Sequence, residues 1–319
     1  MDYKCDFLNS INGIELDVDV DNLLSVKHTF RICNNPQIIS DFYCPVTTPM
    51  IGRSQLENSQ RLKAYFISQF TVQEDDFEYE KYTLLLLHIS AQFSHALWLI
   101  KDNAVRFNLG HLKYRGIGMI AVHSNFINSL YTNHHGEKPI TKFSKEEIEK
   151  SKKYFDILVK NNILKVENEP EYNTYAGSNR IRRAFYFIDI ARRSFDIGTK
   201  VSLYCSAFEC LFSVASSELR HRLSETIANF LEDEFDSKKS IYQKMKLIYD
   251  LRSSVTHGSG INGKLLKNDS LRLKAIGENC DNILRRSILK IISDEKLLNL
   301  YLENNNEKIK EYMININFK

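Results

Sequence analysis

Near the end of a predicted helix, an arginine and a histidine have the types and spacing to do chemistry together. Arg252 and His257 are separated by four residues, and Gly258 and Gly260 follow at once. Arginine stays cationic and can grip phosphate oxygens, and an imidazole can act as general acid or base near neutral pH. These two groups suffice for RNA cleavage without a metal ion, in which the 2′-OH attacks phosphorus and a 2′,3′-cyclic phosphate remains.

The place of this pair in its helix decides whether the two side chains can act together. On an uninterrupted α-helix, five residues turn the second side chain about 140° from the first. Gly258 favours the left-handed conformation that ends a helix, so we expect the helix to stop at about His257. At such an end His257 can swing back beside Arg252. On spacing alone, the alternative is a helix-capping histidine and an ordinary arginine.

Three segments of the C-terminal half carry a resemblance to a known family. They are CSAFECLFS (Cys205–Ser213), ELRHRLSETIANFLE (Glu218–Glu232) and YDLRSSVTHG (Tyr249–Gly258). In this order they resemble the HEPN superfamily, specifically its ApeA-like branch, over roughly residues 144–302. The resemblance implies a helical bundle that pairs as a homodimer. Two Arg–His helix ends then face each other across an RNA-cleaving cleft.

The resemblance also implies roles for single residues. Arg252 and His257 match the catalytic motif, and Glu209 matches the acidic position of the second helix, where it either positions the pair or is structural. Ser253 stands where many HEPN nucleases have Asn or Asp, and with Asp250 it is interpreted as a supporting residue. Some members lack nuclease activity, so a non-catalytic dimerisation or RNA-binding regulatory module is the alternative function.

The family context implies an effector of bacterial anti-phage defence (abortive infection) or of a toxin–antitoxin pair. An antitoxin or a phage component would then be a partner besides RNA. ApeA-like proteins also carry an N-terminal sensing or regulatory region, and residues 1–140 would fill that place. No cofactor is implied.

The composition suits a cytoplasmic protein with one large or two modest domains. The chain has 319 residues, of which 43% are apolar, and its six cysteines are scattered without a C-x-x-C pair. Such cysteines indicate reduced thiols, and the N-terminus does not read as a secretory signal. Residues 141–319 carry 31 Lys and Arg against 25 Asp and Glu. This mild excess suits an anionic partner, or is an ordinary solvated surface.

The periodicity of apolar residues predicts a mainly α fold, with a C-terminal up-down helical bundle (141–319) preceded by a smaller α+β domain (1–140). In the first part we expect a strand at Asn12–Val20 and a buried helix from Glu78 to about Phe93. The apolar run Thr83–Ile100 is interpreted as this helix running into a strand, and a membrane span is the less favoured alternative. The segment Tyr131–Pro139 is predicted to be a linker. The helices expected after it begin at Ser144, capped by Glu147, and then cover about 179–195, 200–214, 216–231, 237–256 and 269–302.

Other basic residues and several histidines are candidates for binding roles. Arg183, in an arginine-rich helix with nearby aromatics, and Arg220 and Arg222 are candidates for RNA contacts, with a solvated surface as the alternative. Histidines are also weighed as metal ligands, but no acidic or cysteine partner stands at ligand spacing along the chain, so no metal site is expected. The histidines concerned are His95, His111, His123, His134 and His135. The sequence also lacks a phosphate-binding loop and a G-x-S-x-G nucleophile motif.

Overall fold

The computed structural model describes residues 2–17, 21–25, 29–62, 64–164, 178–213 and 219–318. This part of the chain divides into two compact units, the first of residues 2–131 and 138–160 and the second of 132–137, 161–164 and 178–318. An antiparallel sheet with helices forms the first unit and helices dominate the second, which confirms a mainly α protein with an α+β N-terminal part. Val18 and Val20 of the predicted strand, and Glu218 in the second of the family-like segments, lie outside the described residues.

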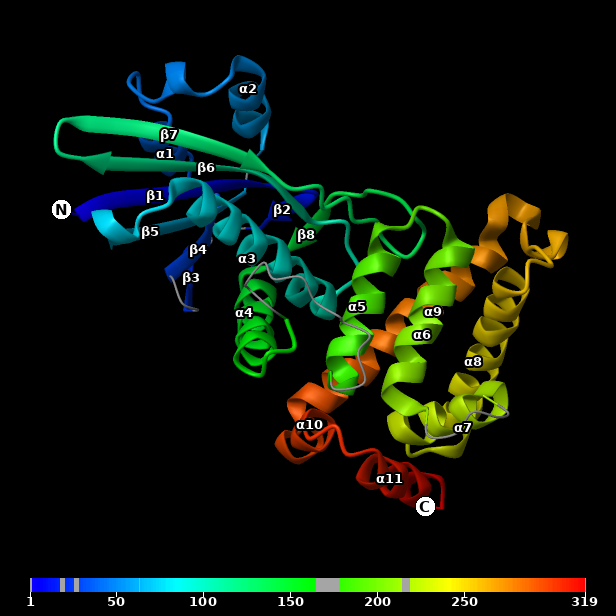
Figure 1. The fold of residues 1–319 in the computed structure, drawn as a ribbon. Coiled ribbons are helices and arrows are strands. Elements are labelled where there is room, and N and C mark those ends of the chain that lie inside the picture. Colours follow the sequence, from blue (N-terminus) through cyan, green and yellow to red (C-terminus); the bar gives the residue numbers. More distant parts are fainter. Residues whose placement is uncertain are drawn as a thin grey trace. The chain divides into compact units, whose positions relative to one another are not determined.

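The first unit is built on a six-stranded antiparallel sheet (Figure 1). Its strands, in spatial order, are β3 (Asp21–Ser25), β4 (Thr29–Cys33), β5 (Tyr65–Gln73), β1 (Asp2–Asn12), β6 (Arg106–Gly116) and β7 (Met119–Phe126). A separate parallel pair joins β2 (Ile14–Leu16) to β8 (Thr141–Phe143). The predicted strand at Asn12–Val20 contains only the short β2, and the long strand β1 precedes it. The sequence pattern does not reveal β1, because this strand buries side chains on both faces and so lacks the alternation of a one-sided strand.

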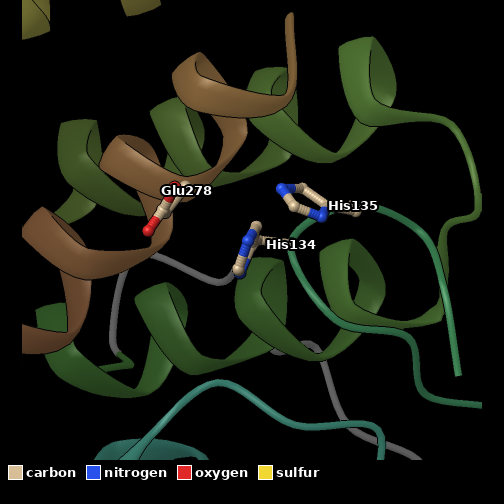
Figure 2. Close-up of side chains that lie close together, drawn as sticks. All are labelled: His134, His135 and Glu278. Carbon is tan, nitrogen blue, oxygen red and sulfur yellow. The ribbon is translucent and has the colours of Figure 1, made fainter. Parts of the chain in front are cut away.

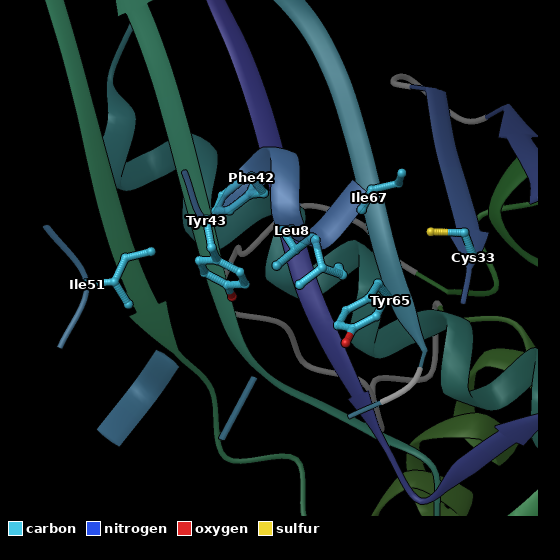
Figure 3. Close-up of a cluster of buried hydrophobic side chains, with 8 residues drawn as sticks. Leu8, Cys33, Phe42, Tyr43, Ile51, Tyr65 and Ile67 are labelled. Atoms are coloured by element: carbon cyan, nitrogen blue, oxygen red, sulfur yellow. The ribbon is translucent and has the colours of Figure 1, made fainter. Parts of the chain in front are cut away.

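Helices cover both faces of β1. On one side is α3 (Tyr79–Ile100), where the amide of Asn9 donates to the hydroxyl of Ser90 at 2.9 Å. On the other side Leu8 packs in a buried cluster with α1 (Pro36–Phe42), shown in Figure 3. The rest of this cluster comprises Cys33, Ile39, Phe42, Tyr43, Ile51, Tyr65 and Ile67. α2 (Arg53–Arg61) follows α1 along the chain.

The apolar helix α3 is the core helix of the first unit. Among the described residues it is the one helix long and apolar enough to cross a membrane, but 72% of its most apolar window is buried inside the protein. Burial of this kind is typical of the core helix of a soluble protein. This confirms the buried helix predicted from Glu78. The helix continues to Ile100, however, whereas the sequence pattern predicts an end near Phe93 and a strand beyond it.

Helix α4 (Lys145–Lys160) begins with the predicted capping box. The Ser144 amide donates to Glu147 Oε2 at 3.0 Å, and the Glu147 amide donates to Ser144 Oγ at 3.3 Å. The helix packs on α3, where the rings of Phe93 and Phe155 meet edge to face with centroids 5.2 Å apart. It therefore belongs to the first unit, whereas the predicted boundary at residue 140 assigns it to the bundle.

The second unit consists mainly of seven helices in its described part. They are α5 (Arg180–Arg193), α6 (Ile197–Phe212), α7 (Leu219–Leu231), α8 (Phe235–Thr256), α9 (Lys267–Ser293), α10 (Glu295–Leu302) and α11 (Asn306–Asn317). The helix predicted to run to Leu302 is broken at Asp294, whose side chain accepts from the Leu297 amide at 3.0 Å and starts α10. The predicted linker is partly folded onto this unit, since the Thr132 amide donates to the Arg192 carbonyl at 2.7 Å.

Candidate active site at the end of helix α8

The end of α8 lies where the glycines predict it. His257 is the last residue that caps the helix, and its amide donates to the Ser253 carbonyl at 3.0 Å. Gly258 follows with φ +69° and Gly260 with φ +74°. A side chain at Gly258 would meet no atom within 4 Å, so its backbone conformation, and not a lack of space, is what favours glycine there.

Arg252 is held by the acidic residue predicted on the neighbouring helix. Its Nη2 atom lies 3.3 Å from Oε1 of Glu209 on α6, and both side chains keep only about a quarter of their exposure (26% and 24%). The contact has the distance of an ion pair but not the geometry of a hydrogen bond, and within the described residues Oε1 accepts none. Burial raises the pKa of Glu209, and the attraction of Arg252 only partly opposes this effect.

His257 does not share this ion pair. Its side chain is exposed, and within the described part of the chain no hydrogen bond joins it to Arg252. The reason is the helical turn: Thr256, four residues after Arg252, points to α6 and places its hydroxyl 3.2 Å from that of Ser202. His257 is one residue further round, so the expected swing back to Arg252 is not present in this structure.

The two supporting residues of the motif have different surroundings. Asp250 Oδ2 accepts from Arg220 Nη2 of α7 at 2.7 Å, and about half of each side chain is exposed. Ser253 is exposed, and its carbonyl receives the His257 amide. Asp250 thus joins two helices, and Ser253 contributes its backbone to the helix end.

Arg220 also lines a cleft whose residues on α8 are not predicted from the sequence. The other lining residues are His221, Tyr242 and Lys246. Lys246 Nζ lies 5.4 Å from the centre of the Tyr242 ring, and the His221 ring meets the same tyrosine edge to face at 5.7 Å. Tyr242, Lys246 and Asp250 recur every four residues on α8, and this spacing is the signal that could have identified the cleft.

The arginine-rich helix α5 serves mainly as a structural element. Arg180 is buried and donates to the carbonyls of Cys210 and Ser213 at 3.2 and 2.9 Å, and Arg192 is fully buried. Arg183 is half-buried and donates to the Ser178 carbonyl, whereas Arg222 on α7 is exposed. Of the predicted RNA-contacting arginines, Arg220 and Arg222 are therefore the exposed ones.

The end of α8 offers the anchored cation of Arg252 and the exposed imidazole of His257. The cleft beside Arg220 adds further basic side chains, including Lys246. These groups can hold phosphate oxygens and transfer a proton. Comparisons of the chain with models of protein families, with curated proteins and with solved structures give no significant match.

Proposed function

We propose that this protein is a metal-independent endoribonuclease of the HEPN superfamily that leaves a 2′,3′-cyclic phosphate. The observation that carries the proposal is the end of α8, where an anchored Arg252 precedes an exposed His257 at a helix terminus closed by Gly258. In the reaction an imidazole accepts the 2′-OH proton, the 2′-oxygen bonds to phosphorus, and the P–O5′ bond breaks. The leaving 5′-oxygen takes up a proton, and Arg252 stabilises the charge on the phosphorane.

Glu209 is assigned a positioning role in this mechanism. It limits the conformations of the long Arg252 side chain and so lowers the entropy that would be lost on binding phosphate. A homodimer would supply a second Arg252–His257 pair. The separation of Arg252 from His257 within one chain is consistent with a composite site of this kind.

Arg220, Arg222 and Lys246 are proposed to bind the RNA backbone, and Tyr242 offers a ring on which a base can stack. The Arg220–Asp250 ion pair does not prevent this, because an exposed pair contributes only about 0–1 kcal/mol. Binding should weaken steeply with salt concentration.

The proposed setting is a bacterial cytoplasm in which the protein acts in anti-phage defence or as a toxin. The first unit would sense the trigger, which is either a phage component or the loss of an antitoxin. All six cysteines are free thiols, as suits a reducing compartment.

The decisive experiment uses the purified full-length chain, a single-stranded RNA and EDTA. Wild type should cleave the RNA, and should spare the same strand with 2′-O-methyl groups. The Arg252→Ala and His257→Ala variants should lose roughly 100-fold or more in rate. Arg272→Ala, an exposed arginine on α9, is the matched control and should cleave normally. Equal cleavage by wild type and both site variants would overturn the proposal.

A non-catalytic RNA-binding regulator is the second candidate. The pairing of Arg252 with Glu209, away from His257, favours it. This function predicts salt-sensitive RNA binding without cleavage, and expression in bacteria with no difference in growth between wild type and His257→Ala, with or without phage.

A further inference from the structure

Two adjacent histidines in the segment 132–137 meet an acidic side chain from a distant part of the chain. Figure 2 shows His134 and His135 beside Glu278 of α9. One ligand atom from each residue lies within 4.8 Å of the others. No metal site is expected from the sequence, because no acidic partner stands nearby along the chain, but folding supplies one.

Hydrogen bonds from backbone amides to the Asn133 side chain fix the segment that carries the two histidines. Asn133 Oδ1 accepts from the amides of His135 and Glu137 at 3.0 and 2.8 Å. Gly136 has φ +77°, and a Cβ atom there would overlap the backbone carbonyl of Phe195. The imidazoles therefore stand on a rigid turn that is held against the helices.

A glycine on α9 allows this turn to approach the helix. A Cβ atom at Gly277 would lie 2.9 Å from the His134 carbonyl oxygen, closer than such atoms are found. The absence of a side chain lets the backbone of the turn rest on α9, so the next residue, Glu278, reaches the imidazoles. Gly277 thus explains how Glu278 and His134 come together.

The position of the His135 imidazole suits a metal ligand. Within the described residues its Nε2 atom is buried and has no hydrogen-bond partner. A ring nitrogen without a hydrogen-bond partner is a position at which a metal ion can bind.

We propose that His134, His135 and Glu278 bind one divalent transition-metal ion, with Zn²⁺ as the best fit. Two imidazoles and one carboxylate are the donor set of zinc sites that keep a fourth position open, whereas Mg²⁺ and Ca²⁺ prefer oxygen ligands. Tetrahedral zinc needs its ligand atoms roughly 3.4 Å apart. Metal binding would require rotations of the exposed Glu278 side chain and of the imidazoles that bring the ligand atoms together from up to 4.8 Å.

The bound ion would clamp the turn to α9 and would not take part in RNA cleavage. Neither Arg252 nor His257 is a ligand. The inference therefore stands independently of the proposed function, and metal binding can be measured without an RNA substrate.

The test uses untagged full-length protein, because a histidine tag would itself bind metal. After treatment with EDTA and its removal, Zn²⁺ is titrated by calorimetry, and bound metal is counted by mass spectrometry. We expect one Zn²⁺ per chain, a rise in melting temperature on binding, and no displacement by equimolar Mg²⁺.

Variants tie this binding to the three residues. His135→Ala and Glu278→Gln should each weaken Zn²⁺ binding by at least ~100-fold. His221→Ala, an exposed histidine elsewhere in the second unit, is the matched control and should bind as wild type does. The metal-free variants should melt as the metal-free wild type does, which excludes misfolding. Substoichiometric binding by wild type, or equal affinity in all variants, would overturn the proposal.

Discussion

His111 lies inside the antiparallel sheet of the first unit, whereas His257 lies at the exposed end of α8 in the second. The His111 ring bonds Ser124 Oγ through Nδ1 at 2.7 Å and Ser59 Oγ through Nε2 at 3.5 Å. Its burial lowers the pKa to about 4, so the ring stays neutral and structural. His257 makes no such contacts in the described part of the chain. The comparison shows that surroundings, and not residue type, separate a core histidine from a candidate acid–base group.

Removing each imidazole in turn should give the largest and most different effects. His257→Ala should lower RNA cleavage by roughly 100-fold or more, because a proton-transfer group is lost. It should change the free energy of unfolding by no more than about 0.5 kcal/mol, because the side chain is exposed. Cleavage assays and urea denaturation measure the two effects. A large loss of stability would mean that His257 is structural.

His111→Gln should give the opposite result, with normal cleavage per folded molecule and a free energy of unfolding lower by about 1–2 kcal/mol at pH 7.5. The wild-type histidine also adds a dependence on pH. Between pH 6.5 and about 4 the unfolded chain binds a proton at this residue and the folded chain does not. The contribution of His111 to the free energy of unfolding is therefore fully present above pH 6.5. It falls by about 3 kcal/mol as the pH drops to 4.

Urea denaturation of wild type and His111→Gln at several pH values isolates this contribution, since other groups titrate in both proteins. The variant should show a shallower decline below pH 6.5. Parallel declines would show that His111 binds its proton equally well in the folded and the unfolded protein.

The glycines that follow α8 in the sequence made the end of this helix predictable. Gly258 ends the helix as predicted, and Glu209, which the resemblance assigns to the acidic position of the motif, lies 3.3 Å from Arg252. The break at Asp294 was missed, because apolar periodicity continues from α9 into α10 and a single capping aspartate is a weak signal. The meeting of His134 with Glu278 was missed because the two lie far apart in the sequence, and no local pattern encodes such a contact.

A smaller effect sharpens the role of the anchored arginine. Glu209→Gln removes the charge that holds Arg252 and should lower cleavage about 10-fold, through kcat more than KM if Arg252 acts chiefly in the transition state. Arg252→Lys, which keeps the charge but loses the planar fork, is the companion variant. Unchanged cleavage in Glu209→Gln would leave Glu209 a purely structural residue.

The smallest effect is expected at the exposed ion pair of α7 and α8. Asp250→Asn should change the free energy of unfolding by less than about 0.5 kcal/mol, because both side chains are half exposed. Affinity for RNA should rise slightly, since Arg220 loses its competing carboxylate. Filter binding at low and high salt measures this change in affinity. Weaker binding would contradict the proposal that Arg220 binds the RNA backbone.

Glu147 has a consequence beyond the cap that it forms. Its Oε2 atom also lies 2.6 Å from Nζ of Lys101, the residue that ends α3. One carboxylate therefore contacts both the residue that ends α3 and the backbone at the start of α4. In native-state hydrogen exchange, the amides at these two helix ends should open together as one cooperative unit. The amides of α4 should then exchange at the same rate as those of the first unit, and not at the rate of the helices that follow α4 along the chain.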